Sequence, residues 1–510
     1  MSYTNTLGTI SSEAILTVVS LLYLLFSPLV VAANAEEKQA TEIELYSEPA
    51  PEFKSVLTEA QHGDLFELID RGIIRVAVTY SKTHYFVEDG AQHGLSYEML
   101  REFESYLAKR YKSRRNGRAL SVIAIPVARD ELIEKLAKGE AELAVANLTM
   151  TRQRLEKVDF SIPVIKEVKE VIVASADAPR LSALNELSGK NVYIRESSSF
   201  FTHLSALNTK LINQGLKPAN IIAADEHLEV EDLMEMANAD LIDYTIVDSH
   251  IAELWRKIFS DIVVYNNLAV HSGGDIGWAV RKNTPNLIYE VNRFLERHRS
   301  GTLFGNIVKQ RYLSNPYWAE KALDEEEKKR FESVISLFEK YGERYDFNHL
   351  MLLAQGYQES QLDHSRKSPV GAIGIMQLMP TTGAAMDVGN IKDLENNVHA
   401  GSKYLRKIVD HYFNDPAIDA ENRVLFAFAA YNAGPTRISR LRRKTESLGL
   451  DPNIWFGNVE HTVAKHIGRE TVSYVANISK YFIAYRLIEA QSNERDEAKQ
   501  NLKQKVSNAL

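Results

Sequence analysis

The sequence predicts a multidomain chain, with an α/β domain of two lobes followed by an all-helical domain. Strand-like and helix-like segments alternate between residues 70 and 312, which is typical of an open and mainly parallel sheet. From residue 331 onward the strand-like pattern stops and only helical candidates remain. The length of 510 residues is sufficient for two large domains or three smaller ones.

The composition is that of an ordinary globular protein, with 45% hydrophobic and 25% charged residues, and it excludes a wholly disordered chain. The net charge of −8 argues against nucleic acid as a partner, because nucleic-acid binders are usually basic on one face. The absence of cysteine excludes disulfides, thiolate catalysis and a lipid-modified N-terminal cysteine. The histidines are scattered, and we predict neither a metal site nor a cofactor.

The N-terminus has the features of an export signal. Residues 14–31 are apolar, and an A-x-A cleavage pattern follows at residues 33–35. We therefore predict a signal peptide over residues 1–35, a loose lead-in over residues 36–69, and a mature protein outside the cytoplasmic membrane. An uncleaved anchor is the alternative, because the apolar stretch is close to the ~20 residues that span a bilayer.

The α/β domain is predicted over residues 70–312. Runs of β-branched residues after turn signals predict strands, and amphipathic stretches predict helices. The strands form two sets, which predicts two lobes joined by two crossings near residues 170 and 270. The predicted strands are residues 73–78, 120–127, 143–146, 170–175, 191–194, 220–223, 244–248, 262–265 and 277–280, and the predicted helices include residues 95–111, 131–138 and 287–299.

A charged linker is predicted over residues 313–330, before the all-helical domain of residues 331–490. A polar tail over residues 491–510 is expected to fray. The predicted helices of this domain are residues 331–344, 347–358, 380–386, 394–413, 421–432, 435–447, 458–466 and 470–489.

One motif of the α/β domain consists of NLTMTRQR at residues 147–154 and VDFSIP at residues 158–163. It resembles the signature of family 3 periplasmic solute-binding proteins, which bind amino acids between two hinged lobes. The resemblance implies that Arg154 holds a ligand carboxylate, a task that suits the planar fork of a guanidinium.

The same resemblance implies a regulatory ligand site for a small zwitterion or a muropeptide. It places Asp248 at the ligand amine, Tyr80 where the family often stacks an aromatic ring, and Thr149 beside Arg154. The alternatives are a surface or capping role for Arg154 and a helix N-cap for Asp248, since aspartate before a helix is a common cap.

Four segments of the helical domain carry the second motif. They are GYQES at residues 356–360, SPVGAIGIMQLMP at 368–380, AYNAG at 430–434 and ETVSYV at 470–475. In this order they resemble the soluble-lytic-transglycosylase type of lysozyme-like fold. Joined to a solute-binding domain behind an export signal, they resemble the membrane-bound lytic murein transglycosylase family. The resemblance implies peptidoglycan glycan strands as substrate and a periplasmic location, peripheral on the inner face of the outer membrane.

Glu359 is the predicted catalytic residue. Cleavage of a β-1,4 glycosidic bond needs an acid at the leaving oxygen, and Glu359 stands at a helix end beside apolar residues, where burial raises a carboxyl pKa. The resemblance implies that Glu359 acts first as acid and then as base, and that the product is a 1,6-anhydro sugar. It also implies a set of substrate-binding residues, which are Ser360, Met376, Gln377, Tyr431, Asn432 and Tyr474.

Some roles in this set have alternatives. Ser360 is expected to support the Glu359 loop by hydrogen bonding, since the motif places no base beside it. Met376 is as readily explained by core packing as by sugar contact. Tyr474 or Asn432 is expected to position the substrate N-acetyl group.

Two other functions compete with the lytic transglycosylase. One is a hydrolytic muramidase that uses Glu359 with Asp363, which stands where the family commonly has Asn-Pro. The other is a solute or wall receptor whose helical domain is inert. Under the main hypothesis the α/β domain regulates the enzyme, and a simple tether is the alternative.

Overall fold

The computed structural model describes residues 59–115, 120–315, 318 and 325–507. The predicted signal peptide, most of the lead-in and about half of the linker lie outside these residues. In the described ranges, no helix is both long and apolar enough to cross a membrane.

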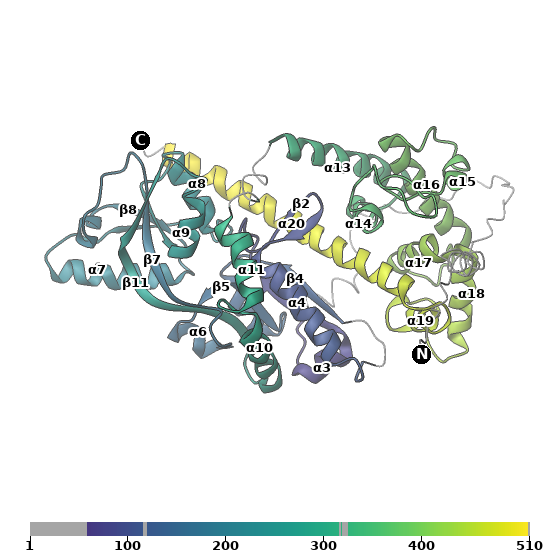
Figure 1. The fold of residues 1–510 in the computed structure, drawn as a ribbon, viewed down its shortest axis with the longest axis horizontal. Coiled ribbons are helices and arrows are strands. Elements are labelled where there is room, and N and C mark those ends of the chain that lie inside the picture. The colour runs from purple at the N-terminus through teal and green to yellow at the C-terminus, as the bar shows by residue number, and fades with distance from the viewer. Residues whose placement is uncertain (1–58, 116–119, 316–317, 319–324, 508–510) are drawn as a thin grey trace, which may run out of the picture.

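The predicted fold class is confirmed, with an α/β domain followed by an all-helical one (Figure 1). The main sheet has the strand order β4-β1-β5-β11-β7-β10-β8-β9, and β6 pairs with β11 outside this path. The strands are β1 (Ile73–Val78), β4 (Ser121–Pro126), β5 (Leu143–Thr149), β6 (Val158–Phe160), β7 (Ile165–Ser175), β8 (Asn191–Ile194), β9 (Asn220–Ala223), β10 (Tyr244–Asp248) and β11 (Ile262–Arg281).

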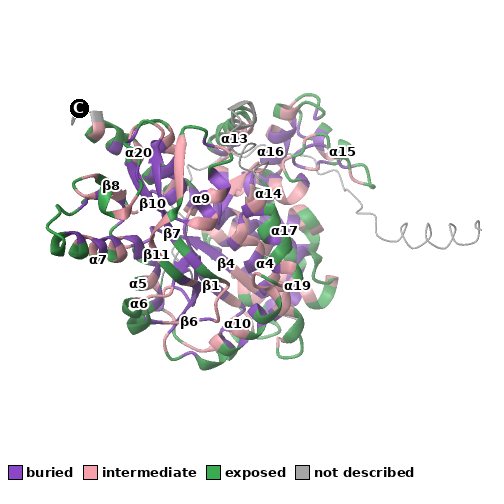
Figure 2. Ribbon diagram, turned by 60° about the vertical axis from the view of Figure 1, so that its left-hand side comes forward, coloured by how far each residue is buried: buried purple, intermediate pink, exposed green. Residues whose placement is uncertain are grey.

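Helices cover this sheet and leave β1, β5 and β10 almost wholly buried, whereas β9 and the first half of β11 are partly exposed (Figure 2). Several of the helices begin at a side-chain N-cap, as at Ser198 and Thr302. The helices are α3 (Leu65–Arg71), α4 (Leu95–Arg110), α5 (Glu131–Lys138), α6 (Arg152–Lys157), α7 (Ser199–Asn213), α8 (Val230–Asn238), α9 (Ser249–Trp255), α10 (Pro285–His298) and α11 (Leu303–Lys309), with short turns at Leu184–Leu187 and Gln310–Ser314.

The domain has two lobes with separate cores. Strands β1, β4 and β5 run parallel in the first lobe, and β8, β9 and β10 run parallel in the second. The long strands β7 and β11 lie antiparallel between them and pass from one lobe to the other.

Strand β11 differs from the prediction of two separate strands at residues 262–265 and 277–280. It is continuous, and its pairing with β7 contains several register shifts. The polar and glycine-rich residues 266–275, which suggested a break, are accommodated at these bulges.

The expectation of a loose lead-in is wrong for residues 65–69, which belong to α3. Asp64 and Glu67 form a capping box at the start of this helix, and Gly72 ends it with a left-handed conformation. Leu65 and Leu68 are buried in the core of the first lobe, so α3 is part of the folded domain.

The helical domain packs around α17, whose residues 424–430 are all buried. Its helices match the predicted ones to within a few residues, apart from the first and the last. They are α13 (Glu325–Tyr345), α14 (His349–Ser360), α15 (Pro380–Ala384), α16 (Leu394–Tyr412), α17 (Ala420–Ala433), α18 (Pro435–Glu446), a short turn at Trp455–Val459, α19 (Glu460–Ile467) and α20 (Glu470–Ser507).

The last helix, α20, continues far beyond its predicted end at residue 489. Its 38 residues correspond to a length of about 57 Å, and Figure 1 shows it leaving the helical domain and crossing the α/β domain. Arg495 and Lys499 form ion pairs with Asp232 at the start of α8, while Ala498 and Leu502 are buried against the second lobe. The expectation that the tail frays is therefore wrong for its described residues, because their partners lie on another domain.

Candidate active site and ligand pocket

Glu359 lies in the last turn of α14, and its side chain is partly buried. Burial raises the pKa of Glu359 from 4.5 to about 7, although Tyr474 and Arg366 act in the opposite direction. The Tyr474 hydroxyl donates a hydrogen bond of 2.5 Å to Oε1 of Glu359. A carboxyl group with a pKa near 7 can both give and take a proton at neutral pH, which is the property that a general acid–base catalyst needs.

Tyr474 reaches Glu359 from the start of α20, which packs against α14. Its hydroxyl also accepts a hydrogen bond of 3.3 Å from Nε2 of the buried Gln355. Burial and the neighbouring Glu359 raise the pKa of Tyr474 well above 10, so the phenol remains a donor at neutral pH. The structure thus brings together two residues that are 115 positions apart in the sequence.

Ser360 and Tyr431 fix the loop that follows α14. The Ser360 hydroxyl bonds to the carbonyl oxygen of Gly356 at 3.1 Å and to that of Ile375 at 2.8 Å. The Tyr431 hydroxyl donates to the carbonyl oxygen of Met376 at 2.7 Å. The Met376 side chain is fully buried in the domain core, in agreement with its packing alternative.

Gln377 and Asn432 are also tied to neighbouring chain. Gln377 has a positive φ of 44°, and its Nε2 donates to the carbonyl oxygens of Arg366 at 3.1 Å and Gly374 at 2.8 Å. The exposed Asn432 accepts a hydrogen bond of 2.7 Å from the Thr471 hydroxyl at the start of α20.

Asp363 is exposed and engaged in a local turn. Its Oδ1 accepts hydrogen bonds from the backbone N–H of Ser365 at 2.9 Å and from the Ser365 hydroxyl at 2.6 Å. These bonds lower the pKa of Asp363, so the group is ionised at neutral pH. The carboxylate therefore stabilises the turn after α14, a role that requires no part in catalysis.

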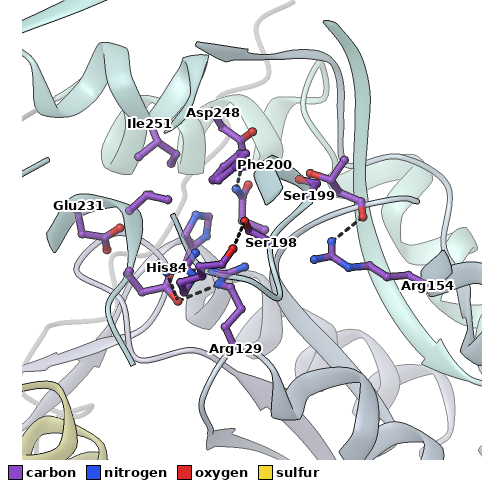
Figure 3. A pocket seen from close by; sticks show the side chains of 14 residues that line it. His84, Arg129, Arg154, Ser198, Ser199, Phe200, Glu231, Asp248 and Ile251 are labelled. Atoms are coloured by element: carbon purple, nitrogen blue, oxygen red, sulfur yellow. Dashed lines mark hydrogen bonds and ion pairs between the residues drawn. The ribbon is translucent and has the colours of Figure 1, made fainter. Parts of the chain in front are cut away.

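A second site lies between the two lobes of the α/β domain, and three of its four predicted residues line it: Thr149, Arg154 and Asp248. In Figure 3 Asp248 lies above Arg129, with Arg154 to the right, so charged groups approach the pocket from several sides. Tyr80, the fourth, is not among the lining residues, and its ring lies 5.4 Å from the Arg495 guanidinium of α20. The cavity measures about 20 Å³, which is enough for about one water molecule.

Arg154 and Asp248 are held in different ways. The Arg154 guanidinium donates to the carbonyl oxygens of Thr149 at 2.8 Å and Ser197 at 3.0 Å, and burial together with Arg129 lowers its pKa to about 10. Oδ2 of Asp248 accepts a hydrogen bond from Asn147, whereas its buried Oδ1 has no partner among the described residues. Burial and the nearby Glu170 raise the pKa of Asp248 to about 7.

An ion pair between the lobes lines the same pocket. Arg129 follows β4 of the first lobe, and Glu229 stands at the N-cap of α8 in the second. Two parallel hydrogen bonds of 2.9 and 2.6 Å join them, and Arg195 lies 3.6 Å from the same carboxylate. The lobes are thus closed on each other through side chains of the protein itself.

The two domains match known family models. The model described as "Transglycosylase SLT domain" matches residues 336–453, and the model described as "Bacterial extracellular solute-binding proteins, family 3" matches residues 73–313. The chain therefore joins a family 3 solute-binding domain to a transglycosylase SLT domain. Tyr474 lies beyond the matched part of the SLT domain.

Curated relatives align with most of this chain. A protein of Desulfosudis oleivorans, named "Membrane-bound lytic murein transglycosylase F", is 28% identical over 82% of this chain and 91% of its own length. A Pseudomonas fluorescens protein of the same name is 27% identical over 81% and 84%. Among solved structures, "An ancestral arginine-binding protein bound to arginine" aligns at 22% identity with a TM-score of 0.37, over 48% of this chain and 99% of that one.

Three functional or structural residues were not predicted from the sequence, namely the buried Arg129 and Arg195 of the solute-binding domain and the buried Asn397 of the SLT domain. Arg129 and Arg195 both follow the carboxyl ends of predicted parallel strands. Ligands of open α/β sheets bind at these ends, so the positions of the two arginines could have predicted a role in the pocket. Asn397 lies within a predicted helix, yet its amide holds the loop at residues 373–376 through hydrogen bonds to Met376, Ile373 and Ile391. Nothing in the local sequence indicates that role.

Proposed function

We propose that this protein is a peptidoglycan lytic transglycosylase in which Glu359 acts first as acid and then as base. The bond cleaved is the β-1,4 bond between N-acetylmuramic acid and N-acetylglucosamine. The observation that carries the proposal is the partly buried Glu359 carboxyl, with a pKa of about 7 and the Tyr474 hydroxyl as its donor.

The chemistry needs one carboxyl group. Protonated Glu359 gives its proton to the leaving oxygen, and the bond from C1 of N-acetylmuramic acid to that oxygen breaks. The resulting carboxylate, which accepts the Tyr474 hydrogen bond, takes the proton of the C6 hydroxyl of the same sugar. That oxygen then bonds to C1, which yields a 1,6-anhydro end without consumption of water.

The position of Asp363 supports this mechanism over hydrolysis. The usual hydrolytic mechanism uses a second carboxylate beside the scissile bond. The Asp363 carboxylate instead accepts two hydrogen bonds from Ser365 in an exposed turn.

Digestion of purified sacculi tests the reaction. Mass spectrometry of the products in ¹⁸O-labelled water is expected to find 1,6-anhydro ends without incorporated label. Labelled reducing ends would contradict the transglycosylase mechanism and favour a muramidase. The absence of any cleavage by the full chain would favour the receptor alternative.

We further propose that the solute-binding domain takes a small zwitterion, with a carboxylate at Arg154 and an amine at Asp248. The unpartnered Oδ1 of Asp248, buried and with a raised pKa, is suited to a cationic donor. Because the closed cavity measures only about 20 Å³, entry of such a ligand requires the lobes to separate and the pair of Arg129 with Glu229 to break.

Calorimetry with free amino acids and with muropeptides tests whether this site binds a ligand and which of the two kinds of compound it binds. Loss of a charged hydrogen bond costs about 1.5–3 kcal/mol, so Arg154→Ala is expected to weaken binding about ten- to a hundredfold. Equal binding to both proteins would contradict the assignment. Turnover of the full chain with and without the bound compound then separates regulation from a simple tether.

The family relationship supports a place in the cell envelope, and we propose the periplasm, with peripheral attachment to the inner face of the outer membrane. Cell fractionation is expected to recover the protein with outer membranes and to release it in high salt. Recovery only after detergent extraction would indicate an integral anchor instead.

A further inference from the structure

A small hairpin of the solute-binding domain reaches the catalytic domain. It consists of β2 (Phe86–Glu88) and β3 (Ala91–His93), joined by Asp89 and Gly90. Both turn residues have positive φ angles, 50° and 75°, as in the two-residue turns for which Asp-Gly is a preferred sequence. Figure 1 shows the hairpin beside the middle of α20, and Val87 packs against the core of the helical domain.

The tip of the hairpin fits closely against two helices of the helical domain. The carbonyl oxygen of Gly90 accepts a hydrogen bond of 2.5 Å from the Tyr485 hydroxyl of α20. A β-carbon at Gly90 would come within 2.7 Å of Cδ1 of Leu362 and within 3.2 Å of the Tyr357 ring. A side chain at Gly90 would therefore require Leu362 to shift, and the positive φ of Gly90 adds backbone strain for any residue with a β-carbon.

Leu362 belongs to the strained turn that follows α14, the helix that carries Glu359. Gln361 and Leu362 both have φ angles of 60°, a left-handed conformation that costs about 1–2 kcal/mol for each residue with a β-carbon. Such strain persists only where the surroundings hold the backbone in place. The Leu362 side chain lies between Gly90 of the hairpin and Gly356 of α14. Gly356 stands one helical turn before Ser360.

We propose that Gly90 is a positioning residue for Glu359. The hairpin holds Leu362, Leu362 holds the left-handed turn, and the turn fixes the end of α14 that carries the Glu359 carboxyl beside Tyr474. The solute-binding domain thus completes the packing of the active site without touching the substrate. This inference rests on the proposed transglycosylase activity.

The test is Gly90→Ala in the full chain, with Gly215→Ala as the matched control. Gly215 has a φ of 76°, close to the 75° of Gly90, but a β-carbon there would meet nothing within 4 Å. Both variants therefore carry similar backbone strain, and their difference isolates the packing of the hairpin tip against Leu362, Tyr357 and Tyr485. Kinetics on soluble glycan strands, across pH, provide the readout.

Gly90→Ala is expected to lower kcat about ten- to a hundredfold relative to Gly215→Ala, because small misplacements of a catalytic group have effects of this size. KM is expected to change less than about twofold. In the pH profile of kcat, the limb that reports the pKa of Glu359 is expected to shift. A merely structural role would lower the unfolding temperature of both variants without moving this limb.

Tyr485→Phe is the second variant, because it removes only the hydroxyl that donates to Gly90. Tyr485→Phe is expected to lower kcat several-fold and to shift the limb of the pH profile that reports Glu359. If Gly90→Ala does not fold, this variant alone tests the inference. Values of kcat and a pH profile equal to those of Gly215→Ala would overturn the inference while leaving the proposed function intact. A wild-type chain without cleavage would overturn both.

Discussion

Replacement of Glu359 by glutamine is expected to remove activity and, at the same time, to stabilise the protein above neutral pH. Glutamine keeps the shape of the side chain and can still accept the Tyr474 hydrogen bond, but it carries no titratable proton. General acid catalysis contributes about 10²–10⁴-fold, so the variant is expected to retain less than about a hundredth of wild-type cleavage.

The gain in stability follows from the raised pKa. Between pH 4.5 and about 7 the folded protein keeps the Glu359 proton while the unfolded chain loses it, so the free energy of unfolding falls as the pH rises. At about 1.4 kcal/mol for each pH unit, the wild type loses about 3 kcal/mol across this window. The glutamine variant does not, so the difference is expected to be near zero at pH 4 and about 3 kcal/mol at pH 8.

Urea unfolding of both full chains at pH 4, 6 and 8, followed by circular dichroism, measures this difference. Other titrating groups are common to the two proteins, and their contributions cancel. A difference independent of pH would show that Glu359 has an ordinary pKa and would refute the argument. Cleavage above about a tenth of wild type by a folded variant would refute the catalytic assignment, since even the smallest acid contribution is larger.

Asp363→Asn is expected to keep most activity on sacculi, whereas loss as large as that of Glu359→Gln would favour hydrolysis. Tyr474→Phe removes a hydrogen bond that lowers the pKa of Glu359, so the basic limb of the kcat profile is expected to move to higher pH; an unmoved limb would contradict this coupling. Glu229→Gln breaks the ion pair that joins the two lobes at the pocket, so calorimetry is expected to find tighter binding of the ligand. Weaker binding would contradict the idea that the closed state competes with the ligand.

Local sequence patterns predicted the regular elements well. The strands at residues 191–194, 220–223 and 244–248 and the helix at residues 131–138 have their predicted bounds. Their signals are β-branched runs, helical periodicity and a terminal glycine, and each acts within a few residues. The same locality explains the error at β11. Polar residues and glycines suggested that the strand ends, but β-bulges and pairing with β7 keep it continuous.

Such local patterns could not predict contacts between residues that are far apart in the sequence. The pair of Arg129 with Glu229 spans 100 positions, and the contact of Tyr485 with Gly90 spans 395. Asp89-Gly90 is a strong hairpin signal, but nothing local indicates that its tip meets another domain. The resemblance to known families predicted roles for Glu359 and Tyr474, while the hydrogen bond between them depends on how α14 and α20 pack.

The course of α20 has a consequence for biosynthesis. The polypeptide emerges from its N-terminus first, so the solute-binding domain can fold before the residues of α20 are available. Until then Asp232 lacks Arg495 and Lys499, and the apolar surface around Leu228 lacks Leu502. Completion of the first domain therefore awaits the last segment of the chain, and a nascent or truncated product that ends before residue 490 exposes a surface open to chaperones and proteases.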